Sequence, residues 1–358
     1  MVKKLKKVVR KTRAQKPRIL ILGCGGTIAM VPDRKGVLRA AKTIKQLLHM
    51  VPTLRKHATF DFKQLSNVDS SDLNPSDWTK FAFEAANAVE SGKYQAILFA
   101  HGTDTMAYSA TAVSFVLGER LNIPVAFTGS QLPMVKFGTD ARFNIENTVL
   151  VLTEAIKQRI AEVMVVFYDV VLRASRSIKI SEAAFAAFGS PAFPPLAGLS
   201  ATGVTFRPEA RRASKAPFRA EDCDFHFNAD VVVLDLVPGF KPGILFDIIH
   251  SGKCKALVLR SLGAGNVPSR DEFSLIPCIK EATQLKIPVV ITTKFVGGTT
   301  HAGTYGPGRA ALDAGAIESG DLNDVAVHVK VAFLLAQGVR PTTLQKRLLA
   351  PLAGEVSA

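Results

Sequence analysis

The chain has 358 residues, of which 47% are hydrophobic and 21% are charged, a balance typical of a soluble globular protein long enough for two domains. No stretch reaches about 18 uninterrupted apolar residues, so we expect no transmembrane helix and no membrane partner. Four cysteines without a CxxC spacing and seven histidines without a cluster argue against a disulfide scaffold and a structural zinc site. Such cysteines suit a reducing cytosol, so we expect a cytoplasmic protein.

The net charge of +15 is uneven, because nine of the first eighteen residues are lysine or arginine and none is acidic. Three interpretations of this segment stay open: a solvated disordered tail, a mitochondrial transit peptide, and a nucleic-acid contact or nuclear signal. No apolar stretch long enough for a secretory signal follows it. We therefore place residues 1–17 outside the fold as a basic tail, with mitochondria as the alternative location.

Short apolar runs alternate with longer segments of helical periodicity along the rest of the chain. The runs that predict buried strands lie at 17–23, 94–102, 124–130, 161–169, 230–239, 255–266 and 288–295. Segments 75–93 and 140–160 have the apolar spacing of helices. Because strand–helix alternation at this spacing leads to parallel sheets with crossover helices, the pattern predicts an α/β fold.

The alternation of apolar runs and helical segments is less clear at 206–230, where the chain is charged and rich in turn residues. This segment predicts a domain boundary. We expect a larger N-terminal domain over 18–206, with a parallel or mixed sheet flanked by helices. A linker over 207–229 leads to a smaller C-terminal domain over 230–358, which is expected to contain a Rossmann-like parallel sheet.

Polar side chains follow four of the N-terminal strands. The loops are GCGGT at 23–27, HGTDT at 101–105, GSQ at 129–131 and RASRSIK at 173–179. Because open α/β sheets place their sites beyond the carboxyl ends of the strands, we expect these loops to meet at one edge. Thr27, Thr103, Asp104 and Lys179 are therefore candidate site residues, although each alone also fits an ordinary cap, turn or solvated side chain.

The glycine-rich turn before Thr27 does not fit a nucleotide-binding loop. It lacks the lysine of a P-loop, and Ile28 stands where a dinucleotide fingerprint needs its third glycine. The alternative is a nucleophile held on the turn, and a threonine hydroxyl then needs a base to activate it. Lys179 can be that base if burial or neighbours lower its pKa, and Asp104 can orient it.

Six stretches of the chain closely resemble L-asparaginases of the bacterial type, specifically the cytosolic type I branch. They are GGTIAM, SNVDSSDLNPSDW, AHGTDTMAYSATAVSF, FTGSQLP, RASRSIKISEAAFAAFGSP and, in the second domain, RSLGAGNVP. The resemblance extends over residues 17–350 in the family's order. It implies hydrolysis of L-asparagine to L-aspartate and ammonia through an acyl-enzyme, without a metal or a cofactor.

The resemblance also implies a role for each candidate. Thr27 matches the family's nucleophile, and Thr103, Asp104 and Lys179 match a second catalytic set. In that set the lysine keeps Thr103 basic or helps it activate the attacking water, and Asp104 also pairs with the substrate's α-ammonium. Backbone N–H groups near Thr103 would stabilise the oxyanion.

The resemblance assigns substrate binding to the DSSD stretch and to Asn266. Asp69, Ser70 and Ser71 match the family's loop for the substrate carboxylate, which hydroxyls and turn N–H groups hold well. The same residues also fit a helix N-cap, and both roles can hold at once. Asn266 in GAGN matches an asparagine that reaches the neighbour's site, so we expect a homodimer or homotetramer.

Two positions depart from the family pattern. Val37 stands where many members carry a lid tyrosine that activates the nucleophile, and we expect Tyr305, from a neighbouring subunit, to replace it. The alternative for Tyr305 is an ordinary surface loop residue. Arg260 and Asn266 match residues near a regulatory asparagine site of some type I enzymes, but Phe295 replaces its cysteine, so allosteric activation is not inferred.

Two other function classes stay open. The first is the asparaginase-like, ammonia-supplying subunit of a tRNA-dependent amidotransferase, although that subunit carries an extra N-terminal domain and the nucleophile motif here begins near residue 23. The second is a nucleic-acid-binding module without catalysis, which the intact candidate set argues against. We expect a small-molecule substrate, L-asparagine, and no nucleic-acid partner, and we leave the preference between asparagine and glutamine open.

Overall fold

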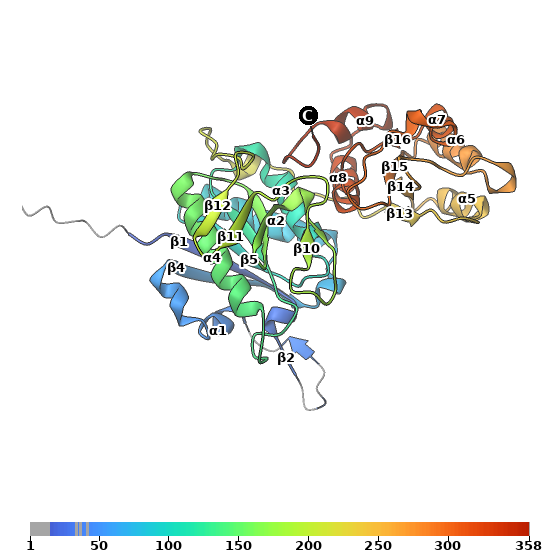
Figure 1. Ribbon diagram of the computed structural model, residues 1–358. Helices are drawn as coiled ribbons and strands as arrows, with labels where there is room; N and C mark the ends of the chain where they lie inside the picture. Colours follow the sequence, from blue (N-terminus) through green and yellow to red (C-terminus); the bar gives the residue numbers. More distant parts are fainter. Residues whose placement is uncertain (1–14, 33–34, 36–37, 41–42, 358) are drawn as a thin grey trace, which may run out of the picture.

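The computed structural model describes residues 15–32, 35, 38–40 and 43–357, and these form two helix-flanked domains (Figure 1). Within these residues the N-terminal sheet is mixed and has eight strands, and the C-terminal sheet is parallel and has four. The α/β fold with a larger N-terminal and a smaller C-terminal sheet is therefore confirmed. Residues 1–14 of the basic tail and Val37 lie outside the described residues.

The N-terminal sheet has the strand order β12-β11-β8-β7-β6-β5-β1-β4. Its strands are β1 (Arg18–Gly25), β4 (Thr59–Val68), β5 (Ala96–Ala100), β6 (Val125–Thr128), β7 (Val163–Phe167), β8 (Val170–Arg173), β11 (Ala197–Ser200) and β12 (Gly203–Phe206). Strands β4, β1, β5, β6 and β7 pair in parallel, and the remaining strands pair antiparallel. The carboxyl ends of β1, β5 and β6 consequently lie at one edge of the sheet.

Helices cover both faces of this sheet, which explains the uninterrupted apolar run of β1. The helices of the domain are α1 (Ile44–Leu48), α2 (Pro75–Glu90), α3 (Met106–Leu117) and α4 (Ala141–Gln158). Leu20 and Leu22 lie in a core with residues of α2 and α3, while Ile19 and Ile21 lie in a core with residues of α4. Successive side chains of a strand alternate between faces, so both sets are buried. Helices α2 and α4 confirm the two helices predicted from periodicity.

The route of the chain after β7 differs from the prediction. We expected loop 173–179 to follow the carboxyl end of a strand that runs with its neighbours, but β8 is antiparallel to β7. A tight turn reverses the chain at Tyr168, which has φ +54° and whose N–H donates to Asn144 Oδ1 at 2.9 Å. From β8 the chain reaches Lys179 through η5 (Ala174–Arg176) and the two-residue strand β9 (Ile178–Lys179).

The C-terminal sheet has the strand order β13-β14-β15-β16 and carries helices on both faces (Figure 1). Its elements are β13 (Val231–Asp235), α5 (Pro242–His250), β14 (Ala256–Ser261), α6 (Ile276–Gln284), β15 (Val289–Thr293), α7 (Gly306–Asp313), β16 (Ile317–Glu318), α8 (Asp324–Ala336) and α9 (Pro341–Leu349). Residues of α5, α6 and α7 share one core, and residues of α8 and α9 share the other.

Helix α8 joins the two domains. Val325, Val329 and Phe333 belong to the N-terminal core beside α3, and the Phe115 and Phe333 ring centroids lie 6.2 Å apart. The segment 207–230 between the two sheets also contacts α2, where Thr79 Oγ1 donates to Phe225 O at 2.6 Å. The linker boundaries 207 and 229 stay a prediction.

The remaining elements are short. They are η1 (Thr27–Ala29), β2 (Met30–Pro32), β3 (Leu38–Ala40), η2 (Pro52–Lys56), η3 (Ser70–Asp72), η4 (Gly118–Arg120), β10 (Phe188–Gly189), η6 (Ala220–Asp222), η7 (Asp271–Phe273) and η8 (Ala302–Thr304). Among the helices in the described part of the chain, none has the length and apolar character needed to cross a membrane.

Candidate active site

Three glycines bring the end of β1 into close backbone contact with the ends of β4 and β5. Gly25 and Gly26 have φ +91° and +83°, a region that side chains disfavour. A Cβ on Gly26 would lie 2.2 Å from Gly102 Cα, and one on Gly25 would lie 2.4 Å from Val68 O. Since Gly26 directly precedes Thr27, and Gly102 directly precedes Thr103, this contact holds the two threonines on adjacent strand ends. The glycines thus serve close approach of two backbones.

Thr103, Asp104 and Lys179 form one hydrogen-bonded group. Lys179 Nζ lies 2.8 Å from Thr103 Oγ1 and 2.5 Å from Asp104 Oδ1. Thr103 is buried, whereas the Asp104 side chain is 62% exposed. Lys179 therefore joins the buried hydroxyl of Thr103 to the carboxylate of Asp104. The second oxygen of that exposed carboxylate can still bind another cation. Loops 101–105 and 173–179 do meet, as the sequence predicts.

Gln131 is a member of this group that was missing from our predicted site. Its Oε1 accepts from Thr103 Oγ1 at 3.4 Å, and its amide donates to the backbone oxygens of Glu182 and Ala184 at 2.8 and 3.1 Å. Gln131 thus connects Thr103 to the segment that follows Lys179. Its position in the GSQ loop after β6 was the signal that could have identified it.

The loop after β4 contacts the same strand ends. Asp69 Oδ1 accepts from the N–H and the hydroxyl of Ser71 at 2.9 and 2.8 Å and so caps η3. Ser70 is buried against Gly102, and its carbonyl accepts from Thr105 Oγ1 at 2.8 Å. Asp69 thus caps only the short helix η3, whereas the helix expected after this stretch, α2, is capped by Asn74. The DSSD loop lies beside the Thr103 loop.

His101 is the buried imidazole nearest the group, and it is held by hydrogen bonds on both ring nitrogens. Nδ1 lies 2.7 Å from Gly102 O and Nε2 lies 2.9 Å from Ser109 Oγ. Burial lowers the pKa of His101 to about 4, so the ring is neutral near pH 7. It supports the end of β5 and adds no positive charge beside Thr103.

A cavity of about 340 Å³ opens between the two domains at Lys179 and Asp104. The C-terminal domain contributes Arg260, Phe295 and Asp321 to its lining. Arg260 pairs with Asp235 and Asp324, with N···O distances of 3.2 Å to each, while its Nε is buried without a hydrogen-bond partner. The Lys179 group therefore faces a space that both domains enclose.

Tyr305 and Asn266 do not join this group within one chain. Tyr305 is 58% exposed at the N-cap of α7, which Figure 1 places on the far side of the C-terminal domain from β1 and β2. Asn266 lies in a tight turn whose backbone pairs with Leu262. Among the described residues no contact links either side chain to Thr27 or Thr103, so their expected site roles require a neighbouring subunit.

No metal-binding cluster is evident in the part of the chain that the structure describes, since no three His, Cys, Asp or Glu side chains converge there. The four cysteines are all free thiols. The chemistry available at the strand ends is thus that of two threonines, a lysine, carboxylates and backbone N–H groups.

Comparison with known families covers both domains. A model described as "Asparaginase, N-terminal" matches residues 18–212, and one described as "Glutaminase/Asparaginase C-terminal domain" matches residues 230–348. The chain is 31% identical to L-asparaginase 1 of Escherichia coli (strain K12) over 357 residues, which is 96% of this chain and 99% of the relative.

A second kind of relative is equally similar. The chain is 32% identical to a Glutamyl-tRNA(Gln) amidotransferase subunit of Aeropyrum pernix over 351 residues, 95% of this chain and 79% of that protein. Among solved structures, the thermostable L-asparaginase of Thermococcus kodakarensis superposes with a TM-score of 0.85 at 28% identity, covering 95% of this chain and 99% of that one. From both domain matches and these similarities, the chain belongs to the asparaginase family and is an amidohydrolase of that family.

Proposed function

We propose that the protein hydrolyses the side-chain amide of free L-asparagine to give L-aspartate and ammonia. The observation that carries this proposal is the Lys179–Thr103–Asp104 group, held next to Thr27 by the contact between Gly26 and Gly102. Amide hydrolysis through an acyl-enzyme needs a nucleophile, a way to activate water, and a holder for the substrate's charges. The strand ends carry side chains for each of these tasks.

In the first step, Thr27 Oγ attacks the amide carbon and the C–N bond breaks. The hydroxyl proton passes through a base to the departing nitrogen, so ammonia leaves and an ester to Thr27 remains. Tyr305 of a neighbouring subunit is our proposal for this base, in place of the lid tyrosine of other family members. Backbone N–H groups near Thr103 stabilise the oxyanion that forms on the amide oxygen.

In the second step, water attacks the ester carbon and L-aspartate leaves Thr27. Lys179, after releasing one proton to solvent, takes the hydroxyl proton of Thr103, 2.8 Å away, while Thr103 removes a proton from this water. The proton is then passed to Thr27 Oγ as the ester C–O bond breaks. Asp104 binds the α-ammonium of the substrate with its exposed oxygen. The Asp69 loop, with Ser70 and Ser71, binds the α-carboxylate.

Substitution of Thr27 tests the proposal. Thr27→Ala should lower kcat/KM for L-asparagine by about 10³-fold or more, because the acyl-enzyme cannot form. Thr202→Ala is a matched control, since Thr202 lies in the turn between β11 and β12, and three strands of the sheet separate β11 from β5. Acid-quenched turnover followed by peptide mass spectrometry should find the aspartyl ester on Thr27. An unchanged rate in Thr27→Ala would contradict the mechanism.

The similarity to the Glutamyl-tRNA(Gln) amidotransferase of Aeropyrum pernix supports a second candidate, an ammonia-supplying subunit that works with tRNA. Ammonia release from free L-asparagine and free L-glutamine, each measured with and without aminoacylated tRNA, separates the two. Release from L-asparagine alone supports the asparaginase. Release that occurs only with tRNA supports the amidotransferase function.

We also propose that the protein is cytoplasmic and forms a homodimer or homotetramer. The free thiols support a reducing compartment. The exposed Tyr305, far from β1 in one chain, supports an assembly that completes the site. Light scattering of the purified protein and localisation of the full-length chain, with and without residues 1–14, test these two points.

A further inference from the structure

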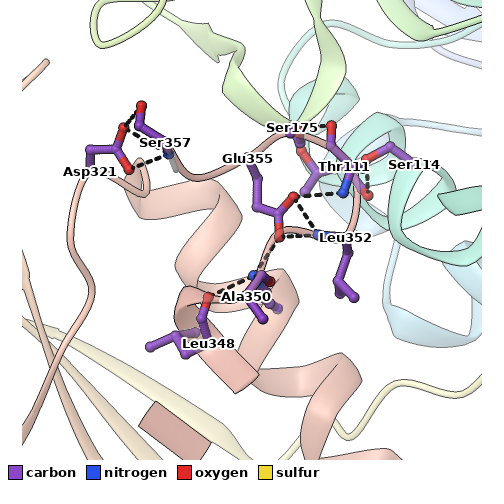
Figure 2. A network of polar contacts seen from close by, with 12 residues as sticks. Thr111, Ser114, Ser175, Asp321, Leu348, Ala350, Leu352, Glu355 and Ser357 are labelled. Carbon is purple, nitrogen blue, oxygen red and sulfur yellow. Dashed lines mark hydrogen bonds and ion pairs between the residues drawn. The ribbon is translucent and has the colours of Figure 1, made fainter. Parts of the chain in front are cut away.

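The last described residues, 351–357, lie between the two domains, and we call this segment the C-terminal strap (Figure 2). Ala353 is buried, and Glu355 has no exposed surface. The match to the family's C-terminal domain model ends at residue 348, before the strap begins. A buried carboxylate in a chain terminus needs a structural reason, because burying an unpaired charge is costly.

On the C-terminal side, Glu355 closes the strap onto α8 and α9. Its carboxylate pairs with Lys330 of α8, and neither side chain is exposed. Lys330 Nζ also donates to the carbonyls of Leu348 and Ala350 at 2.6 and 2.7 Å, so the ammonium has three acceptors. Figure 2 shows the Glu355 carboxylate turned back to the strap's own backbone, where Leu352 N–H donates to it at 2.9 Å. The Lys330 ammonium and the Glu355 carboxylate thus both have their hydrogen-bond partners, and together they close the strap into a loop.

On the N-terminal side, the same loop holds η5. Arg176 Nε donates to Gly354 O at 3.0 Å, and Ser175 Oγ donates to Ala353 O at 3.2 Å. Arg176 is 2% exposed, and its NH1 pairs with Asp321 Oδ2 at 2.8 Å. Ser357 N–H donates to the other oxygen of Asp321 at 3.0 Å, so the strap and η5 share one carboxylate.

Helix η5 leads directly to Lys179. Arg176 ends η5, and β9 (Ile178–Lys179) follows after one residue. Strand β9 is two residues long and pairs in its sheet with the equally short β10, so its ladder supplies little support of its own. Asp321, which binds both Arg176 and the strap, lines the same interdomain cavity as Lys179 and Asp104. The Lys179 backbone is therefore anchored through η5 on one side, in addition to the buried Ile178 side chain and the short pairing with β10.

We propose that the C-terminal strap positions Lys179 against Thr103 by holding η5, with Arg176 and Glu355 as the positioning residues. The expected effect on turnover rests on the function proposed above. The expected effect on the position of Lys179 does not. A lysine displaced by about 1 Å loses its hydrogen bond to Thr103, and misplacement of that size lowers turnover by up to about 100-fold. Residues 351–357 would then determine the reactivity of a site at the strand ends of the N-terminal domain.

The closing experiment compares R176K with R18K. R176K keeps a cation near Asp321 but loses the guanidinium's planar set of donors to Gly354 O and Asp321. R18K changes a partly exposed pair with Asp61 at the start of β1, so it is the matched control. The first readout is the rate at which an amine-acylating reagent labels Lys179, measured by peptide mass spectrometry with Lys253 as an internal standard. This readout requires no turnover.

R176K should label Lys179 several-fold faster than the wild type and lower kcat for L-asparagine by about 10- to 100-fold, with a smaller change in KM. It should also shift the pH profile of kcat, which a loss of folded protein alone would not do. R18K should leave the labelling rate of Lys179, kcat and the pH profile of kcat unchanged. Should R176K unfold, S175A, which removes one hydrogen bond to the strap, takes its place and should show the same pattern with smaller changes.

Two outcomes separate this proposal from the proposed function. Faster labelling of Lys179 in R176K, together with a wild type that releases no ammonia from L-asparagine, would support the strap and overturn the asparaginase. Unchanged labelling and an unchanged pH profile in a folded R176K or S175A protein would overturn the strap, whatever the activity of the wild type.

Discussion

Two lysine–carboxylate pairs in this molecule have the same chemistry but different surroundings. Lys330 and Glu355 are fully buried, and every donor and acceptor around them belongs to the protein. Lys179 and Asp104 lie at a cavity, with side chains 18% and 62% exposed, and the lysine also contacts a threonine hydroxyl. The first pair closes a loop, whereas the second leaves a carboxylate oxygen and a hydroxyl open to a ligand. Both pairs join a lysine to a carboxylate. The exposure of the side chains and the additional contact of Lys179 with a threonine hydroxyl therefore distinguish the candidate site from the buried cross-link.

The largest effect should follow the loss of the exposed pair. Lys179→Met should lower kcat/KM for L-asparagine by about 10³-fold or more, because Thr103 loses the group that takes its proton when it activates water. The free energy of unfolding should change by about 1 kcal/mol or less, since partly exposed pairs contribute little. Steady-state kinetics and urea unfolding measure the two quantities. Lys63→Met, which breaks the surface pair with Glu84, is the control and should leave activity intact.

The buried pair should show the opposite pattern. Lys330→Met leaves the Glu355 charge buried without its partner and should lower the free energy of unfolding by about 3–5 kcal/mol, measured by urea denaturation. Adding Glu355→Gln to Lys330→Met removes the charge and should restore part of the loss. A Lys330→Met protein as stable as the wild type would show that the pair does not close the strap.

His101 extends the comparison to a buried group directly beside the site. Its pKa of about 4 in the folded protein lies below the value of 6.5 that it has when exposed, so the unfolded chain binds more protons between these values. Stability should therefore rise from pH 4 to pH 6.5, by about 3 kcal/mol from this residue. Unfolding of His101→Gln across this range should show a flatter profile. His226→Gln, at an exposed histidine, should follow the wild type.

A smaller effect than these three tests whether the site at the exposed pair is complete within one chain. Tyr305→Phe should lower kcat by about 100-fold if the tyrosine of a neighbouring subunit activates Thr27, because general-base catalysis contributes that much. The variant should keep the oligomeric state of the wild type, which light scattering checks. Unchanged turnover would remove Tyr305 from the mechanism and leave it as a surface residue of α7.

Part of the site could be predicted because its residues follow strands with a clear apolar pattern. The glycine turn before Thr27 and the loop with Thr103 are predicted by local sequence, and their meeting follows from parallel pairing of β1 with β5. Lys179 was correctly grouped with them, but by a wrong route, because the apolar run after Tyr168 is an antiparallel strand. The roles of these residues in catalysis, the linker boundaries and the function of Tyr305 stay predictions.

The sequence by itself determined the α/β class, the alternation of strands and helices, and the glycine-rich turn before Thr27, because these depend on local patterns of apolar residues and on backbone freedom. Only the tertiary structure decided that two backbones touch at these glycines, that Lys179 contacts Thr103, and that Lys330 is buried against Glu355. Lys179 and Thr103 are 76 residues apart in the chain, and Lys330 and Glu355 are 25 apart. No local pattern encodes such contacts, since they arise when packing brings distant elements together.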